Sequence, residues 1–142
     1  MLLEGEITTL EISPVISKLP YHKAPVEDGF PTKFYSWAGE DVASLLSEAF
    51  KEAEQAGSLG PISNRAVIAV LPKPGKDPLQ CRSYRPICLL NGDTKILASV
   101  LATRLRKVIP SLIHNTQVGF VPGRTSRNYM RKLAHTLWIA KG

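Results

Sequence analysis

The sequence predicts an α+β fold in which helices precede and follow a single β-hairpin. Two short apolar runs rich in β-branched residues, 66–71 and 87–90, are separated by Pro- and Gly-rich turn residues, which is the pattern of a hairpin. On both sides of these runs, apolar residues recur at intervals of three and four, which is typical of amphipathic helices. The 142 residues, 44% of them apolar, are enough for about one domain with one core.

A short helix is expected near the start of the chain. Apolar residues there follow a helix-like spacing that Pro14 interrupts. Ser13 is a good N-cap and proline is tolerated at the first helical position, so these residues predict a helix from Pro14 to about Leu19. Residues 1–30 are accordingly expected to form an N-terminal helix and loop.

A longer helical stretch is expected between Pro31 and Gln55, where apolar positions again recur at three and four. The pattern predicts either one amphipathic helix or two helices that are broken near Gly39. Trp37 is interpreted as a core residue, and so is Trp138, for which exposure near the end of the sequence is the alternative.

Two further helices are expected after the hairpin. The tripeptide Asn-Gly-Asp at 91–93 caps the first, and Pro110 stops or kinks it. Thr125 or Ser126 caps the second, in which apolar and basic residues alternate around the helix. The order of elements is therefore helices, one hairpin, then helices.

Charge divides the sequence into two unlike halves. Residues 1–60 hold four Lys and ten Asp or Glu, a net charge of −6, whereas residues 61–142 hold fourteen Lys or Arg and two acids, a net charge of +12. This asymmetry indicates that the second half faces a polyanion, most simply nucleic acid. A solvated basic surface is the alternative.

Membrane and redox signals are weak. No stretch approaches the roughly 18 apolar residues that a membrane span needs, and Glu4 and Glu6 interrupt the start, so we expect a soluble intracellular protein, nuclear or cytoplasmic, without a membrane partner. Cys81 and Cys88 stand in no metal-binding spacing, which favours free thiols. Cys88 is interpreted as a small buried residue.

The predicted hairpin carries four cations near the ends of its strands: Lys73, Lys76, Arg82 and Arg85. Lysine supplies a point charge and arginine a two-pronged donor, so such a tip suits phosphate groups. Alone the signal is weak, because turns that contain Lys and Pro are often simply solvated. For Arg85 the alternative is an ion pair with Asp77 across the hairpin, and for Lys73 it is a solvated strand end.

A second basic signal is the sequence GFVPGR, which ends at Arg124. Its glycines allow tight backbone, and an arginine just ahead of a helix start can meet a nucleic-acid phosphate together with helix N–H groups. A plain capped loop is the alternative. Nucleic-acid contacts are expected from seven basic side chains of the second half, Arg124 among them: Lys76, Arg82, Arg104, Lys107, Arg124, Arg127 and Arg131.

Four blocks in order resemble the reverse transcriptases of non-LTR (LINE-type) retrotransposons. They read VIAVLPKPGKDP, CRSYRPICLLN, DTKILASVLATRLRKVIPSLI and TQVGFVPGR. Upstream, HKAPVEDGFPTKFY is similar to the Lys-x-Pro-Gly-Pro-Asp-Gly block of that family, except that Val26-Glu27 stands where Gly-Pro is usual. The resemblance extends from about residue 10 to the end of the sequence.

The resemblance implies a partial right-hand polymerase fold, truncated before the catalytic palm strands. Residues 1–30 would lead into the fingers, and residues 31–142 would form a single incomplete domain with the fingers and the start of the palm. The resemblance also implies that Lys73 and Arg85 face the triphosphate of an incoming deoxynucleotide, beside an RNA or DNA template-primer. Metal-dependent phosphoryl transfer needs carboxylates, and no Asp or Glu follows Asp93.

The function expected from the resemblance is therefore that of a fragment of an RNA-directed DNA polymerase, inactive by itself, with no catalytic residue and no metal ligand of its own. Mg²⁺ and a deoxynucleoside triphosphate are expected for the intact family enzyme, and its palm and thumb are the missing partners. A stand-alone basic nucleic-acid-binding module and a non-functional retroelement remnant are the alternatives.

Overall fold

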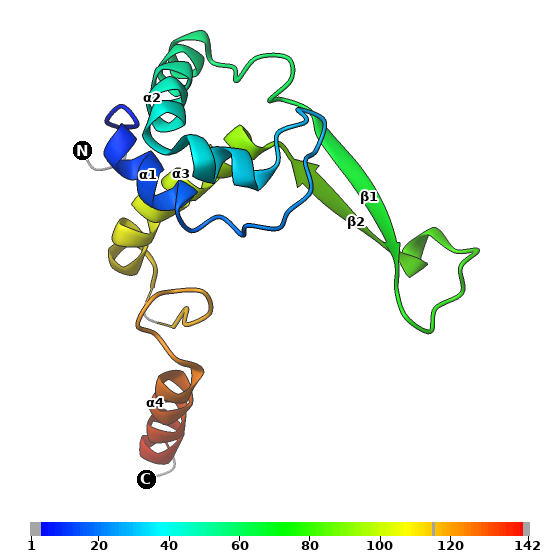
Figure 1. Ribbon diagram of the computed structural model, residues 1–142. Coiled ribbons are helices and arrows are strands. Elements are labelled where there is room, and N and C mark those ends of the chain that lie inside the picture. Colours follow the sequence, from blue (N-terminus) through cyan, green and yellow to red (C-terminus); the bar gives the residue numbers. More distant parts are fainter. Residues whose placement is uncertain (1–3, 115, 141–142) are drawn as a thin grey trace. The chain divides into compact units, whose positions relative to one another are not determined.

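The computed structural model describes residues 4–114 and 116–140 (Figure 1). Along this described part the elements are α1 (Thr9–Ile16), α2 (Thr32–Ala56), β1 (Ala66–Pro72), a short 3₁₀ helix (Cys81–Ser83), β2 (Tyr84–Leu90), α3 (Gly92–Leu112) and α4 (Ser126–Ile139). The α+β class is confirmed, since the described residues form four α-helices and one two-stranded antiparallel sheet.

The chain forms two compact units, which are described separately. The first comprises Glu4–Val100 and the second includes Leu101–Gly142. The boundary expected near residue 30 stays a prediction. Among the helices in the described ranges, none is both long enough and apolar enough to cross a bilayer.

The first helix begins earlier than the sequence predicted. Thr8 is the N-cap of α1, and its backbone N–H donates a hydrogen bond to the Glu11 carboxylate at 3.2 Å. This capping arrangement satisfies an N–H group at the helix start. The prediction that Ser13 caps the helix was wrong, because the Thr8–Glu11 pair starts the helix earlier and leaves Ser13 and Pro14 inside it.

The second helix contains the expected break. Gly39 has φ 48° and ψ −116° inside α2, a conformation that residues with a Cβ rarely adopt. The helix ends at Ala56, and Gly57 takes the left-handed conformation that commonly closes a helix, with φ 66°.

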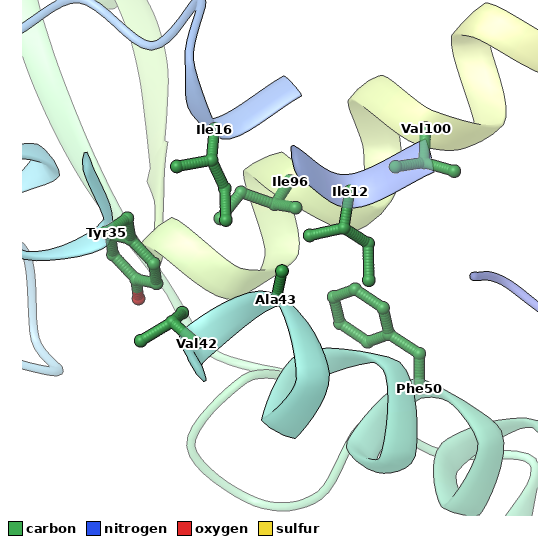
Figure 2. Close-up of a cluster of buried hydrophobic side chains, with 8 residues drawn as sticks. All are labelled: Ile12, Ile16, Tyr35, Val42, Ala43, Phe50, Ile96 and Val100. Atoms are coloured by element: carbon green, nitrogen blue, oxygen red, sulfur yellow. The ribbon is translucent and has the colours of Figure 1, made fainter. Parts of the chain in front are cut away.

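One hydrophobic core lies within the first unit (Figure 2). It contains side chains from α1, α2 and the first turns of α3, namely Ile12, Ile16, Tyr35, Val42, Ala43, Phe50, Ile96 and Val100. Trp37 is not part of this core and is 89% exposed. The prediction was wrong because Tyr35 faces the core, and residues two positions apart on a helix point in different directions. Trp138 is also exposed, and α4 buries no residue.

The hairpin stands with both faces largely open. β1 and β2 pair antiparallel, with Ala66 opposite Leu90 and Pro72 opposite Tyr84, so β2 begins earlier than the expected residue 87. The apolar side chains of both strands are mostly exposed. Cys88 is exposed for the same reason, which corrects its interpretation as a buried residue. A two-stranded sheet without a covering layer has little stability of its own, so its ends must be held.

A polar cluster, here called the hairpin root, holds together the segment that enters β1 and the segment that leaves β2. It consists of Ile62, Ser63, Asn91, Asp93 and Thr94. Asn91 Nδ2 donates to the Ile62 carbonyl at 3.1 Å, Thr94 Oγ1 donates to the Ser63 carbonyl at 3.0 Å, and Ser63 Oγ donates to the Asp93 carboxylate. The side chain of Asn91 therefore binds the segment that enters β1, whereas the sequence had suggested a helix-capping role for it.

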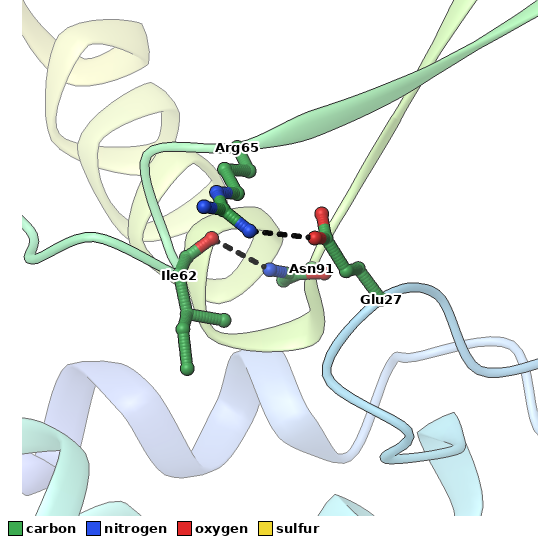
Figure 3. A network of polar contacts seen from close by, with 4 residues as sticks. All are labelled: Glu27, Ile62, Arg65 and Asn91. Atoms are coloured by element: carbon green, nitrogen blue, oxygen red, sulfur yellow. Dashed lines mark hydrogen bonds and ion pairs between the residues drawn. The ribbon is translucent and has the colours of Figure 1, made fainter.

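The loop before α2 is tied to the same place. Arg65, just before β1, forms an ion pair with Glu27 at 3.1 Å (Figure 3). The Gly92 N–H donates to Asp28 Oδ2 at 3.3 Å. These contacts connect the loop to the segments that precede β1 and follow β2.

Tyr35 lies directly against the first residue of α3. A Cβ atom on Gly92 would be 2.3 Å from Tyr35 Cε2, so the packing has room only for glycine. Burial raises the pKa of the Tyr35 phenol above its ordinary value, and the negative charges of Asp28 and Asp93 raise it further.

Gly92→Ala should destabilise the chain by about 1–3 kcal/mol, because the added methyl group must displace the buried Tyr35 ring. At an unobstructed helical position, Gly→Ala usually increases the free energy of unfolding. A decrease at Gly92 would therefore be due to the clash with Tyr35. Gly119→Ala is the control, because its Cβ would meet no atom within 4 Å. Denaturant unfolding measures both variants, and unchanged stability of Gly92→Ala would contradict the close packing.

The free energy of unfolding should also fall as the pH rises above about 10, where a tyrosine ionises in the unfolded chain while Tyr35 stays protonated in the folded chain. Because the pKa of Tyr35 is raised in the folded chain, its contribution to the free energy of unfolding is fully present at lower pH and is lost as the pH rises. Tyr35→Phe should reduce the alkaline decline, because it removes the buried phenol whose pKa is raised. Superimposable pH profiles for wild type and Tyr35→Phe would refute the assignment.

Candidate nucleic-acid interface

Lys73 and Arg85 lie on the same face of the hairpin. Arg85 is opposite Leu71 in the register, and side chains alternate along a strand, so Arg85 shares a face with Leu71 and with Lys73 two residues further on. The Lys73 N–H donates to the Ser83 carbonyl at 2.7 Å, so the pairing continues past the end of β1. Diagonal neighbours of this kind are about 7–8 Å apart, which allows both cations to contact one polyphosphate group.

A pocket of about 430 Å³ lies at the hairpin tip. Lys73 Nζ donates to the Arg82 carbonyl at 2.7 Å, and Arg82 Nε donates to Gln80 Oε1 at 2.5 Å. These contacts hold the two basic side chains against the turn. The pocket is lined by Lys73, Gly75, Lys76, Asp77, Gln80, Arg82 and Ser83.

Asp77, the acidic residue of the hairpin tip, accepts hydrogen bonds within its own turn. The Asp77 carboxylate accepts hydrogen bonds from the Leu79 N–H and from Gln80 Nε2, both at 3.0 Å. In the described part of the chain, the ion pairs are Lys51–Glu6 and Arg65–Glu27, and the alternative pair between Arg85 and Asp77 is not among them. The face of the hairpin that carries Arg85 therefore keeps its positive charge.

In the second unit, Arg124 organises the loop that follows α3. Its Nη1 donates to the carbonyls of His114 and Gln117 at 2.7 and 2.9 Å, and its Nη2 donates to those of Pro110 and Ile113 at 2.9 and 3.0 Å. Carbonyls at a helix C-terminus lack helical partners, and a cation is favourable there. The sequence did not indicate this role, because all four acceptors are backbone groups.

A second basic pocket, of about 230 Å³, lies in the same unit and is lined by Val118, Gly123, Arg124, Asn128, Tyr129 and Lys132. The other expected nucleic-acid residues are exposed with one exception. Arg104 is only 6% exposed, although the sequence analysis counted it among the expected nucleic-acid contacts. The exposed ones are Lys76, Arg82, Lys107, Arg127 and Arg131.

Metal ligands do not gather in this part of the protein. Among residues 4–114 and 116–140, no three His, Cys, Asp or Glu side chains lie close enough to hold a metal ion. The first unit carries cations on a hairpin face and a hairpin-tip pocket, and the second unit separately carries a loop-and-helix pocket.

No protein-family model matches the chain. It is 38% identical over 128 residues to the transposon TX1 uncharacterized 149 kDa protein of Xenopus laevis, a match that covers 87% of the chain and 9% of that protein. It is 30% identical over 116 residues to the RNA-directed DNA polymerase from mobile element jockey of Drosophila melanogaster, covering 80% of the chain and 13% of the polymerase.

A third relative is the putative 115 kDa protein in type-1 retrotransposable element R1DM of Drosophila melanogaster, which is 27% identical over 83% of the chain and 12% of that protein. The chain thus spans at most 13% of the length of these relatives. Over most of its own length, it is homologous to a segment of non-LTR retrotransposon proteins that include RNA-directed DNA polymerases.

Proposed function

We propose that this chain supplies the part of a non-LTR retrotransposon reverse transcriptase that contacts the incoming nucleotide and the template, with the hairpin as part of the fingers and α3 and α4 leading into the palm. The relationship to RNA-directed DNA polymerases supports the substrate class. The observation that carries the proposal is the placement of Lys73 and Arg85 on one face of the hairpin.

The chemistry of this face suits a triphosphate. A triphosphate is a polyanion, and it is bound best by several cations that converge from a fixed support. Arg85 offers two parallel N–H donors and Lys73 offers a compact charge, while Lys76 and Arg82 add positive potential at the tip. In this proposal these residues bind and orient the nucleotide, and no metal-dependent step is assigned to them.

The template is proposed to contact the basic side chains of α3 and α4. Lys107, Arg127 and Arg131 are exposed cations, which bind phosphates without reading sequence and lose affinity as salt rises. A stand-alone nucleic-acid-binding module is the second candidate, favoured by the net charge of +12 over residues 61–142. Binding of a triphosphate at the hairpin distinguishes the two, because a general phosphate-backbone binder has no need of a nucleotide site.

Lys73→Met and Arg85→Gln should each weaken binding of a deoxynucleoside triphosphate to the chain by about tenfold or more, because each removes a charged hydrogen-bond donor. The measurement is a titration with dTTP followed by the backbone amide signals of the hairpin in NMR spectra. Inorganic tripolyphosphate should compete with dTTP, because the phosphates supply the recognised charge.

Lys95→Gln is the matched control, since it removes an exposed cation on α3 of the same unit. It should change dTTP affinity less than about twofold. Equal losses in all three variants would indicate nonspecific charge attraction, and the nucleotide site would then be rejected.

Arg124→Lys should lower the stability of the loop between α3 and α4 by about 1–3 kcal/mol, almost as much as Arg124→Gln, because one ammonium group cannot reach four carbonyls. Hydrogen exchange of the amides from Thr116 to Arg124 measures the effect. Arg131→Lys is the control and should leave this exchange unchanged. If Arg124→Lys preserved both loop protection and template affinity, charge alone would account for the role of Arg124.

A further inference from the structure

The acidic half of the chain carries an exposed group of aromatic and basic side chains that the hairpin interface does not use. Tyr21, His22, Lys33, Phe34 and Trp37 form this group, here called the aromatic patch. Trp37 is 89% exposed and Tyr21 is 51% exposed. Other large apolar side chains of the described chain are also exposed, and the feature that distinguishes this group is the placement of aromatic rings together with lysines.

The members of the patch are neighbours. The Tyr21 and His22 rings meet edge to face with centroids 5.4 Å apart, and Lys33 Nζ lies 5.7 Å from the centre of the Tyr21 ring. Lys33 and Trp37 are one turn apart on α2, and Phe34 and Trp37 are three residues apart, which are the spacings of adjacent side chains on a helix. Aromatic faces and an ammonium group are therefore presented together.

The rest of this segment is anchored. The Phe30 ring packs on Phe34, with centroids 4.7 Å apart. Thr32 Oγ1 donates to the Lys23 carbonyl at 3.4 Å, which holds a second exposed lysine beside the start of α2. The patch thus has ring and backbone contacts of its own, in addition to the contacts that tie its loop to the hairpin root.

Two acids of the loop before α2 are engaged by other groups. The Glu27 carboxylate is paired with Arg65, and the Asp28 carboxylate accepts the N–H groups of Phe30 and Gly92. Glu40 and Asp41 follow the nonhelical backbone of Gly39. The cation that the structure places against a ring of the patch is Lys33, whose Nζ lies over Tyr21.

We infer that the aromatic patch binds single-stranded nucleic acid, with unpaired bases stacked on Trp37 and Tyr21 and phosphates beside Lys33 and Lys23. Every base has an aromatic face, so such stacking tolerates any sequence, and interleaved cations neutralise the backbone. A base-paired duplex keeps its base faces covered and gains nothing from this surface. The inference adds a strand-binding surface in the first 60 residues, where net charge alone argued against one. It does not rest on the nucleotide site.

The test uses the full chain and oligothymidylate of about 12 nucleotides, with fluorescence anisotropy at low salt. Trp37→Ala and Tyr21→Ala should each weaken binding about 5- to 100-fold, the range expected for loss of one stacked base, while Trp37→Phe should keep most of the affinity. Leu45→Ala and Trp138→Ala, which remove other exposed apolar side chains, should change affinity less than about twofold. Binding to a duplex of equal length should not respond to Trp37→Ala.

A spectroscopic readout locates the bound strand. In a Trp138→Phe background Trp37 is the only tryptophan, and saturating oligothymidylate should quench its emission through stacking. If Lys73→Met and Arg85→Gln abolished oligonucleotide binding while Trp37→Ala left it intact, the patch would be rejected and the proposed nucleotide site would stand. A Trp37 emission that responds to protein concentration and not to the oligonucleotide would assign the patch to a second copy of the chain and would likewise overturn the inference.

Discussion

The hairpin depends on its root. Two strands that are open on both faces bury too little apolar surface to keep their position, so the orientation of Lys73 and Arg85 is determined where the strands enter and leave the core. There Asn91 holds the Ile62 carbonyl, and Gly92 leaves room for the Tyr35 ring. Because Gly92 has no Cβ, the Tyr35 ring of α2 packs directly against the start of α3, next to the end of β2.

Three carboxylates near the hairpin and its root accept hydrogen bonds from groups of the protein itself. Asp93 accepts from Ser63, Asp28 accepts from two backbone amides, and Asp77 accepts from its own turn. A carboxylate engaged in this way stabilises loops and helix starts, and Asp77 does so within the tip pocket that Lys76 and Arg82 also line. These three carboxylates therefore hold parts of the scaffold. Among the cations, Lys107, Arg127 and Arg131 are exposed, whereas Arg104 is buried and Arg124 binds backbone carbonyls.

Differences between expectation and structure share one cause. Ser13 and Thr8 are both good caps, and only Thr8 has a glutamate three residues later to complete the arrangement. Trp37 satisfies the apolar periodicity of α2, yet Tyr35 takes the place against α3. Cys88 sits in an apolar run typical of a buried strand, but no layer covers that strand in the described chain. In each case a pattern was compatible with two outcomes, and the surroundings selected one.

The sequence by itself determined the order of helices and strands, the break at Gly39 and the cations near the ends of the strands, because these follow from local periodicity, backbone preference and residue type. Only the tertiary structure decided that Lys73 and Arg85 share a face, that Arg124 binds four carbonyls and that Trp37 faces solvent. Strand register and burial depend on segments that are far apart in the sequence. Backbone carbonyls are present in every residue, so local sequence patterns do not indicate which of them a side chain will bind.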